Sequence, residues 1–156
     1  DRSSAASDVY KRQILGGASK EDADALYDFG VNLGLAFQLK DDLLDVYGDP
    51  LRFGKNIGGD ILCNKKTYLV IKAFEHANTD QEALLSDWFT RETFDPQEKI
   101  AAVTRLYNEI GVKALCENRI VEYSKRASES LNRVNVPAEN KQELETMMNE
   151  LMHREV

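Results

Sequence analysis

Apolar residues recur at helical spacing along most of this chain, and the longest run of that pattern lies near its start. The run predicts one helix from about Lys20 to Tyr47, which is long for a globular domain. Ser19 has the residue type of an N-cap, with Asp22 where a capping box has its acid, and Gly48-Asp49-Pro50 ends the run. The apolar face of this helix consists of Leu26, Phe29, Leu33 and Phe37.

The same periodicity returns in five later stretches, which predicts a protein made of helices. No segment has the alternation of a strand and no linker divides the chain, so the fold class is all-α. Residues 48–64 are expected to form a glycine-rich loop. The helix after Thr79 is expected to carry Leu84, Leu85, Trp88 and Phe89 on one face, with Trp88 in the core. The first of the expected helices runs from near Lys65 to about Ala77, and Thr79 is expected to cap the second. The third begins at Pro96 after an Asp95 cap and ends at Ile110. The last two run from Val112 to about Arg133 and from Ala138 to about His153.

Three carboxylates interrupt the first predicted helix within five residues. They are Asp41, Asp42 and Asp45. At about 100° per residue, these acids and Gln38 share roughly 100° of arc on one helical face. Like charges at i,i+4 repel each other by roughly 0.2–0.5 kcal/mol, and a hard divalent cation such as Mg²⁺ removes that repulsion. The pattern therefore has two interpretations, an amphipathic helix whose acids face water or a metal site.

The residues that follow the acids favour the metal site. Four glycines from Gly48 to Gly59 let backbone N–H groups approach a ligand, and three lysines bring positive charge beside the acids. The lysines are Lys55, Lys65 and Lys66. Metal-binding acids, a glycine loop and lysines form a matched set for a diphosphate, whose oxygens the metal and the ammonium groups neutralise together.

Composition and charge argue against several other classes of protein. The 156 residues carry a net charge of −7 without a basic block, so nucleic acid is not an expected partner. No apolar run approaches the roughly 20 residues that span a bilayer, and stable membrane insertion is not expected. Cys63 and Cys116 lack metal-ligand spacing and predict free thiols in a reducing cytoplasm. His76 and His153 stand alone and are predicted to be surface residues.

The linked motifs F-Q-x-x-D-D-x-x-D, G-K-x-x-G-G-D and K-K-T-Y-L resemble a known family. They are similar to the second aspartate-rich region of trans-polyprenyl diphosphate synthases of the farnesyl and geranylgeranyl type. The resemblance extends from about Ile14 to the end of the chain. It implies a helical bundle of the isoprenoid synthase type, of which this chain is the C-terminal part. It also implies a prenyltransferase of isoprenoid biosynthesis that depends on Mg²⁺, with Mn²⁺ as the alternative.

The reaction that the resemblance implies is the head-to-tail (1′-4) condensation of isopentenyl diphosphate with an allylic diphosphate. The implied metal ligands are Asp41, Asp42, Asp45 and Asp60. The implied substrate-binding residues are Gln38, Lys55, Lys65 and Lys66. Asp41, Asp45 and Lys55 are expected to be catalytic. The family's first aspartate-rich motif is absent from this sequence, so the chain alone is expected to have little or no turnover, and the full-length protein is expected to be a homodimer.

Residues 1–13 are polar and do not match the helix that the family has before the corresponding turn. They are predicted to be a non-native or disordered leader, and residues 14–156 the C-terminal portion of a polyprenyl synthase domain. Two other functions remain open. One is a non-catalytic helical subunit that binds an active synthase, against which the presence of Asp41, Asp45 and Lys55 argues. The other is an enzyme of the terpene-cyclase type, although the lysine-rich sequel fits chain elongation better.

Overall fold

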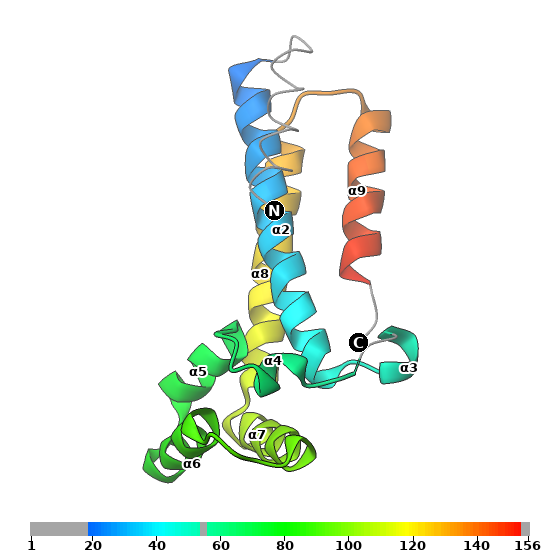
Figure 1. Cartoon of the computed structure of the whole chain (residues 1–156). Helices are drawn as coiled ribbons and strands as arrows, with labels where there is room; N and C mark the ends of the chain where they lie inside the picture. The colour runs from blue at the N-terminus through cyan, green and yellow to red at the C-terminus, as the bar shows by residue number, and fades with distance from the viewer. Residues whose placement is uncertain (1–18, 54–55, 154–156) are drawn as a thin grey trace. The chain divides into compact units, whose positions relative to one another are not determined.

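The computed structural model describes residues 19–53 and 56–153, and every regular element in those ranges is a helix (Figure 1). The predicted all-α class is confirmed. Residues 1–13, the predicted leader, lie outside the described residues. The helices are α2 (Lys20–Tyr47), α3 (Pro50–Phe53), α4 (Gly59–Leu62), α5 (Tyr68–His76), α6 (Thr79–Thr90), α7 (Pro96–Ile110), α8 (Val112–Asn132) and α9 (Ala138–Met152).

The chain divides into two compact units, and the division falls within α2 and α8. The first unit contains the described residues 19–38 and 119–153, and the second contains residues 39–53 and 56–118. None of the described helices is both long enough and apolar enough to span a membrane.

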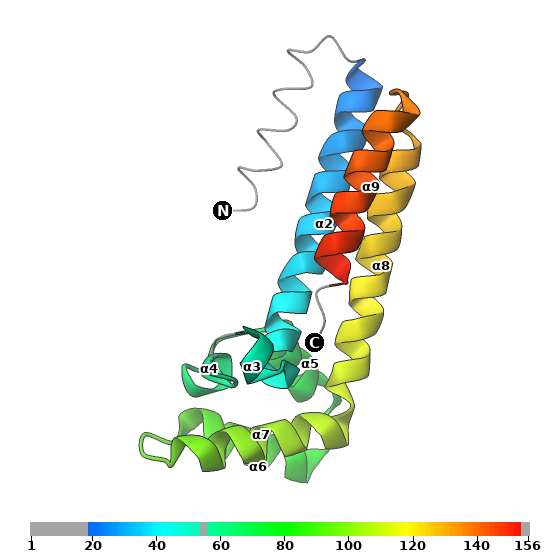
Figure 2. The same cartoon turned by 90° about the vertical axis from the view of Figure 1, so that its right-hand side faces the viewer.

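The first unit is built from α2, α8 and α9, which pack around one apolar core (Figure 2). Ser19 caps α2 as predicted, because the N–H of Asp22 donates to Ser19 Oγ at 3.1 Å. The capping-box contact expected of the Asp22 carboxylate is replaced by a longer-range one. That carboxylate accepts the N–H of Asn135, between α8 and α9, at 2.8 Å. The core side chains are Ala25, Leu26, Phe29, Leu33, Ala127, Leu131, Val134 and Met148.

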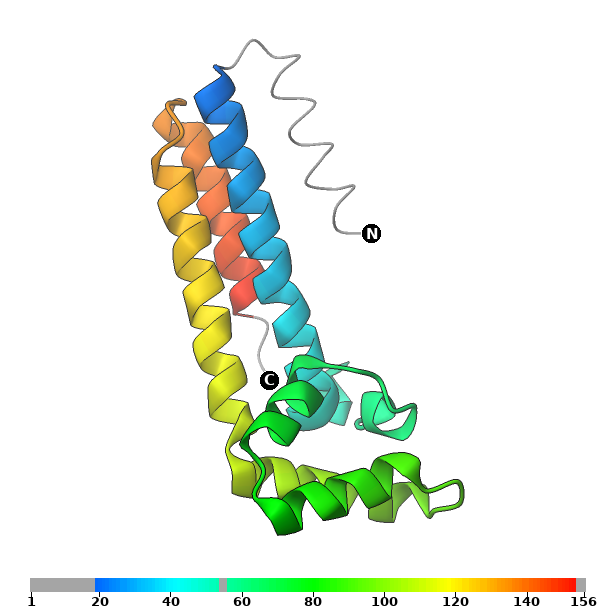
Figure 3. The ribbon, with the colours of Figure 1, turned by 90° about the vertical axis from the view of Figure 1, so that its left-hand side faces the viewer.

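The second unit is organised around α7, which packs against α4, α5 and α6 (Figure 3). Asp95 caps α7 as predicted, accepting the N–H of Glu98 at 3.0 Å, and proline occupies the first turn. The helix ends at Gly111, whose φ of +87° lies in the left-handed region that favours glycine. The buried face of α7 consists of Lys99, Val103, Leu106 and Tyr107.

The helix expected to begin near Lys65 begins instead at Tyr68. Thr67 is its N-cap, and Thr67 Oγ1 accepts the N–H of Val70 at 3.3 Å. This cap is a polar side-chain contact, which the spacing of apolar residues does not reveal. Lys65 and Lys66 consequently lie in the turn before α5 rather than on a helix.

Two expectations for α6 were wrong. Its N-cap is Asn78 rather than Thr79, and the Asn78 side chain accepts a backbone N–H of the first turn in a capping box. Leu84, expected on the same apolar face as Leu85, is 51% exposed. Trp88 is only half-buried, with the guanidinium of Arg91 lying 4.0 Å from its ring centroid. The apolar face of α6 is therefore narrower than its sequence indicates, and Leu85 is its buried residue.

Removing the hydroxyl group of Tyr107 is expected to stabilise the protein. Its side chain is 1% exposed, its hydroxyl has no hydrogen-bond partner among the described residues, and burial raises its pKa. Tyr107→Phe removes that buried hydroxyl, so we expect a gain of about 1 kcal/mol. The melting midpoint, followed by circular dichroism, should rise by roughly 2–4 °C for a protein of this size. Tyr47→Phe is the control, because the Tyr47 hydroxyl donates to Asn108 Oδ1 at 2.8 Å. A fall in the midpoint of Tyr107→Phe would contradict this expectation.

Candidate functional site

The segment predicted as a glycine-rich loop, residues 48–64, contains α3 and α4, and two hydrogen bonds join the start of α4 to Asp45 of α2. The N–H of Gly58 donates to the Asp45 carbonyl oxygen at 2.7 Å, and the N–H of Asp60 donates to Asp45 Oδ2 at 2.9 Å. Gly58 has a φ of +91°, and a Cβ there would lie 2.7 Å from the side chain of Ile100. Glycine at this position therefore permits the turn that places α4 beside the aspartates of α2.

An ammonium group lies between two carboxylates of this segment. Lys65 Nζ is 3.6 Å from Asp42 Oδ1 and 3.7 Å from Asp60 Oδ2. Both distances exceed those of hydrogen bonds, so Lys65 is close enough to attract each carboxylate without donating directly to either. The Asp42 side chain is 6% exposed and that of Asp60 is 21% exposed, whereas that of Lys65 is 49% exposed. The lysine is thus the most accessible charge of the three.

Asp45 experiences opposing influences that leave its pKa above the ordinary value. Burial is the largest cause, and the negative charges of Asp60 and Asp42 act in the same direction. The hydrogen bond from the Asp60 N–H and the positive charge of Lys65 lower the pKa but do not offset the burial. Among the described residues, Lys65 is the one lysine whose ion-pair distance to these acids is short, so Asp42, Asp45 and Asp60 carry more negative charge than it balances. A cation would relieve that imbalance.

The turn after α4 determines where Lys65 points. The N–H of Lys65 donates to the Asp60 carbonyl oxygen at 3.0 Å, and the N–H of Asn64 donates to that of Ile61 at 3.3 Å. These two bonds and the φ of +54° at Asn64 form a Schellman motif, in which the left-handed residue is most often glycine and sometimes asparagine. The motif turns the chain back on α4, which returns Lys65 toward the aspartates.

The remaining predicted site residues differ in their surroundings. Asp41 is half-buried, and its carboxylate makes no hydrogen bond or ion pair within the part of the chain that the structure describes. Lys66 is exposed. Gln38 is half-buried in α2 and belongs to the first unit. Lys55 lies outside the described residues, so its predicted role stays a prediction.

The aspartates fit a metal ion that shares its coordination with a ligand. In the described ranges, no three His, Cys, Asp or Glu side chains are grouped closely enough to hold a metal by themselves. Mg²⁺ does not require such a group, because it is usually bound through one or two carboxylates, with water and substrate phosphates completing its octahedron. The carboxylate of Asp41, which has no partner among the described residues, and that of Asp45, whose pKa is raised by burial, are suitable oxygen donors for an ion held in that way.

Sequence reasoning missed Lys99, which supports the turn at Asn64. Its Nζ donates to Asn64 Oδ1 at 2.6 Å from the buried face of α7. A signal was present in the sequence, because Lys99 lies four positions before Val103, in register with the apolar stripe of that helix. A lysine at such a position predicts a buried charge that needs a partner.

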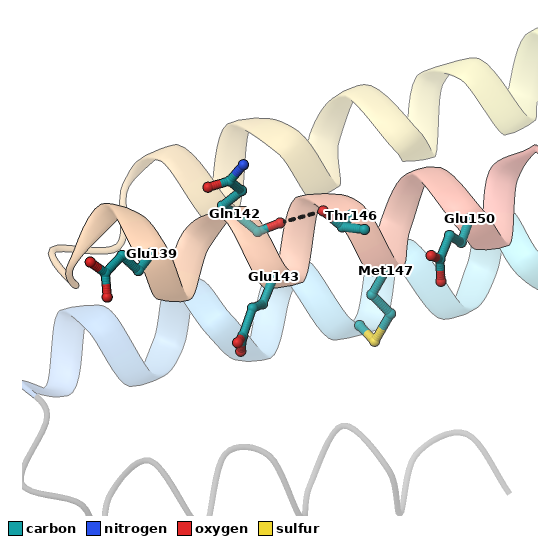
Figure 4. Close-up of a pocket in the computed structure, with 6 residues that line it drawn as sticks. All are labelled: Glu139, Gln142, Glu143, Thr146, Met147 and Glu150. Carbon is teal, nitrogen blue, oxygen red and sulfur yellow. Dashed lines mark hydrogen bonds between the residues drawn. The ribbon is translucent and has the colours of Figure 1, made fainter.

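A second acidic surface lies on α9. Its side chains come from one helix and are exposed, and the close-up shows them projecting from that helix, with Thr146 donating to the Gln142 carbonyl oxygen at 2.8 Å (Figure 4). The residues that line this hollow are Glu139, Gln142, Glu143, Thr146, Met147 and Glu150. It contains no lysine and no buried carboxylate, so it lacks the pairing of opposite charges seen around Lys65.

The chain resembles known proteins over most of its length. Among curated relatives, the short chain isoprenyl diphosphate synthase of Methanothermobacter thermautotrophicus is 47% identical over 74 residues, which are 47% of this chain and 23% of that protein. The geranylgeranyl diphosphate synthase of Sulfolobus acidocaldarius is 32% identical over 123 residues, 78% of this chain and 36% of that protein. A crystal structure of geranylgeranyl pyrophosphate synthase from Corynebacterium glutamicum, complexed with isoprenyl diphosphate and magnesium, matches with a TM-score of 0.78 and 31% identity. That match covers 89% of this chain and 39% of the solved one.

The matched stretches thus span less than half of each of these relatives. The sequence model named Polyprenyl synthetase matches residues 3–109. This range begins inside residues 1–13, whose separation from the domain stays a prediction. A match over more than half of the chain, together with the shared helical fold, identifies its family. The relatives named above are trans-prenyltransferases, and the chain belongs to their family, the polyprenyl synthetase family.

Proposed function

We propose that this chain binds the diphosphate group of an allylic diphosphate together with Mg²⁺, as the second aspartate-rich part of a prenyltransferase. The reaction is the 1′-4 condensation of that diphosphate with isopentenyl diphosphate. The observation that carries the proposal is the position of Lys65 Nζ, 3.6 Å from Asp42 of α2 and 3.7 Å from Asp60 of α4. An accessible ammonium beside one buried and one partly buried acid offers both kinds of group that a metal-bound diphosphate requires.

The residues of the site have distinct tasks in this proposal. Asp41, Asp42, Asp45 and Asp60 would hold the metal ion, which when bound supplies positive charge to the leaving diphosphate. Lys65 contacts the diphosphate oxygens and stabilises the negative charge that they gain as the bond to the allylic carbon breaks. Asp45 has a second task, because its carboxylate fixes the N–H of Asp60 at 2.9 Å. Gln38, Lys55 and Lys66 are further candidates for substrate binding.

The family relatives support the chemistry and also indicate what else it needs. The crystal structure from Corynebacterium glutamicum contains isoprenyl diphosphate and magnesium, which fits the ligands proposed here. The chain corresponds to less than half of that enzyme, and its sequence has one aspartate-rich motif. We propose that turnover requires a second such motif and a site for isopentenyl diphosphate from outside this chain, and that the full-length protein is a homodimer.

The test of this proposal is a calorimetric titration of the chain with inorganic pyrophosphate, in Mg²⁺ and in EDTA. Saturable binding in Mg²⁺ that EDTA abolishes is the expected result, because the acids repel the pyrophosphate when the metal is absent. Lys65→Met should weaken this binding, whereas Lys125→Met, which removes an exposed lysine of the first unit, should not. Equal binding in EDTA, or no binding under either condition, would refute the proposal.

A further inference from the structure

A lysine is completely buried in the second unit, next to the turn that carries Lys65. Lys99 is 0% exposed, and its Nζ donates to Asn64 Oδ1 at 2.6 Å. The ammonium also lies over two aromatic rings, 4.3 Å from the centroid of Phe94 and 5.4 Å from that of Phe89. Burial lowers the pKa of Lys99, which reflects the cost of enclosing a charge. An apolar residue of the same length would avoid that cost, but it could not donate the hydrogen bond to Asn64.

Asn64 connects this buried charge to the candidate site. It occupies the left-handed position of the Schellman motif, with a φ of +54°, where a residue other than glycine needs support. Two side-chain contacts supply that support, since its amide donates to the Phe89 carbonyl oxygen at 3.3 Å and its Oδ1 accepts from Lys99. The next residue is Lys65, whose N–H is bonded to the Asp60 carbonyl oxygen at 3.0 Å. The orientation of Asn64 therefore sets the direction in which Lys65 leaves the turn.

We propose that Lys99 is a positioning residue for diphosphate binding, which holds Asn64 in its left-handed conformation and thereby directs Lys65 toward the ligand. This inference rests on the proposed function, because it concerns the same diphosphate site. Lys99 does not touch the ligand, since it is fully buried, whereas the Lys65 side chain is 49% exposed. Its effect on binding therefore passes through the turn and depends on the presence of Lys65.

A double-mutant cycle tests that dependence. The affinity for inorganic pyrophosphate in Mg²⁺ is measured calorimetrically for the unmodified chain, Lys99→Met, Lys65→Met and the double variant. We expect Lys99→Met to weaken binding about tenfold when Lys65 is present, and to have almost no effect in the Lys65→Met background. A residue that only stabilised the fold would weaken binding equally in both backgrounds. Lys125→Met controls for the loss of one positive charge.

Asn64→Gly tests the same contact without removing the buried lysine. Glycine adopts the left-handed conformation without strain, so the fold should be retained. Glycine is also the most flexible residue, so by itself it does not hold the turn in the one conformation that directs Lys65. The variant loses the side chain that Lys99 holds, and we expect pyrophosphate binding to weaken about as much as in Lys99→Met, within roughly threefold. This variant keeps the proposal testable if Lys99→Met does not give a cooperative melting transition.

The possible outcomes separate this inference from the proposed function. Loss of affinity in Lys99→Met and Asn64→Gly, absent in the Lys65→Met background, supports the positioning role. Unchanged affinity in Asn64→Gly, or additive effects in the cycle, overturns it while leaving the proposed function intact. Failure of the unmodified chain to bind pyrophosphate in Mg²⁺ overturns the proposed function, and the positioning role with it.

Discussion

Asp41→Asn is expected to abolish most of the Mg²⁺-dependent binding of pyrophosphate, with a loss of about 100-fold or more in affinity. The amide is a poorer metal ligand than the carboxylate and carries no charge. The fold should be unaffected, since the Asp41 carboxylate makes no hydrogen bond or ion pair within the described residues. In the full-length enzyme, the same change should lower turnover by orders of magnitude. Titration calorimetry measures the affinity, and the melting midpoint in EDTA measures the stability.

Asp24→Asn is the matched control for this prediction. Asp24 lies on the same helix, is exposed and belongs to the first unit. Its replacement removes the same charge without touching the candidate site, so affinity and midpoint should both stay unchanged. Pyrophosphate binding by Asp41→Asn at the affinity of the unmodified chain would exclude Asp41 as a ligand. A large fall in its midpoint in EDTA would instead assign it a structural role.

Gly58→Ala is expected to destabilise the protein strongly. The φ of +91° disfavours any residue with a side chain, and the new Cβ would lie 2.7 Å from both Cδ1 and Cγ1 of Ile100. Left-handed strain and overpacking together cost about 2–5 kcal/mol. The melting midpoint should fall by roughly 5–15 °C. Pyrophosphate binding should weaken as well, because the N–H of Gly58 donates to the Asp45 carbonyl oxygen at 2.7 Å.

The adjacent glycine provides the control. A Cβ at Gly59 would lie 3.5 Å from Asp45 Oδ1, an ordinary contact, and its φ is outside the range that favours glycine. Gly59→Ala should therefore change the free energy of unfolding by less than about 1 kcal/mol, which corresponds to a shift of less than roughly 2–4 °C in the melting midpoint. Equal destabilisation by the two substitutions would show that the positive φ of Gly58 is not what makes glycine necessary there.

The helix boundaries of this protein were most predictable where the determinants are local. Ser19, Asp95 and Gly111 each define a helix end through residues adjacent in sequence, and the structure shows each in that role. The start of α5 was misplaced because apolar spacing does not reveal the Thr67 cap. Leu84 was misplaced because spacing on one helix does not show which neighbours cover it.

The candidate site was likewise predictable only where it depends on local spacing. The helical periodicity predicts that the aspartates of α2 share one face, but it does not predict which of them lies near Asp60, because that depends on two turns. The turn at Gly58 brings α4 to Asp45, and the turn at Asn64 returns Lys65 to Asp42 and Asp60. Neither pairing follows from spacing, because each joins residues separated by irregular backbone. Lys99 was overlooked since its partner lies 35 positions away in the chain.

The most direct test of this account is to locate the bound metal by paramagnetic broadening. Mn²⁺ is added in small steps to the isotopically labelled chain with pyrophosphate, and amide signals are followed by NMR. The account predicts that signals around Asp42, Asp45 and Asp60 are lost first, and that Asp41→Asn prevents this loss. Earlier loss of the signals of Glu139, Glu143 and Glu150 on α9, or uniform broadening of all signals, would contradict the assignment of the site.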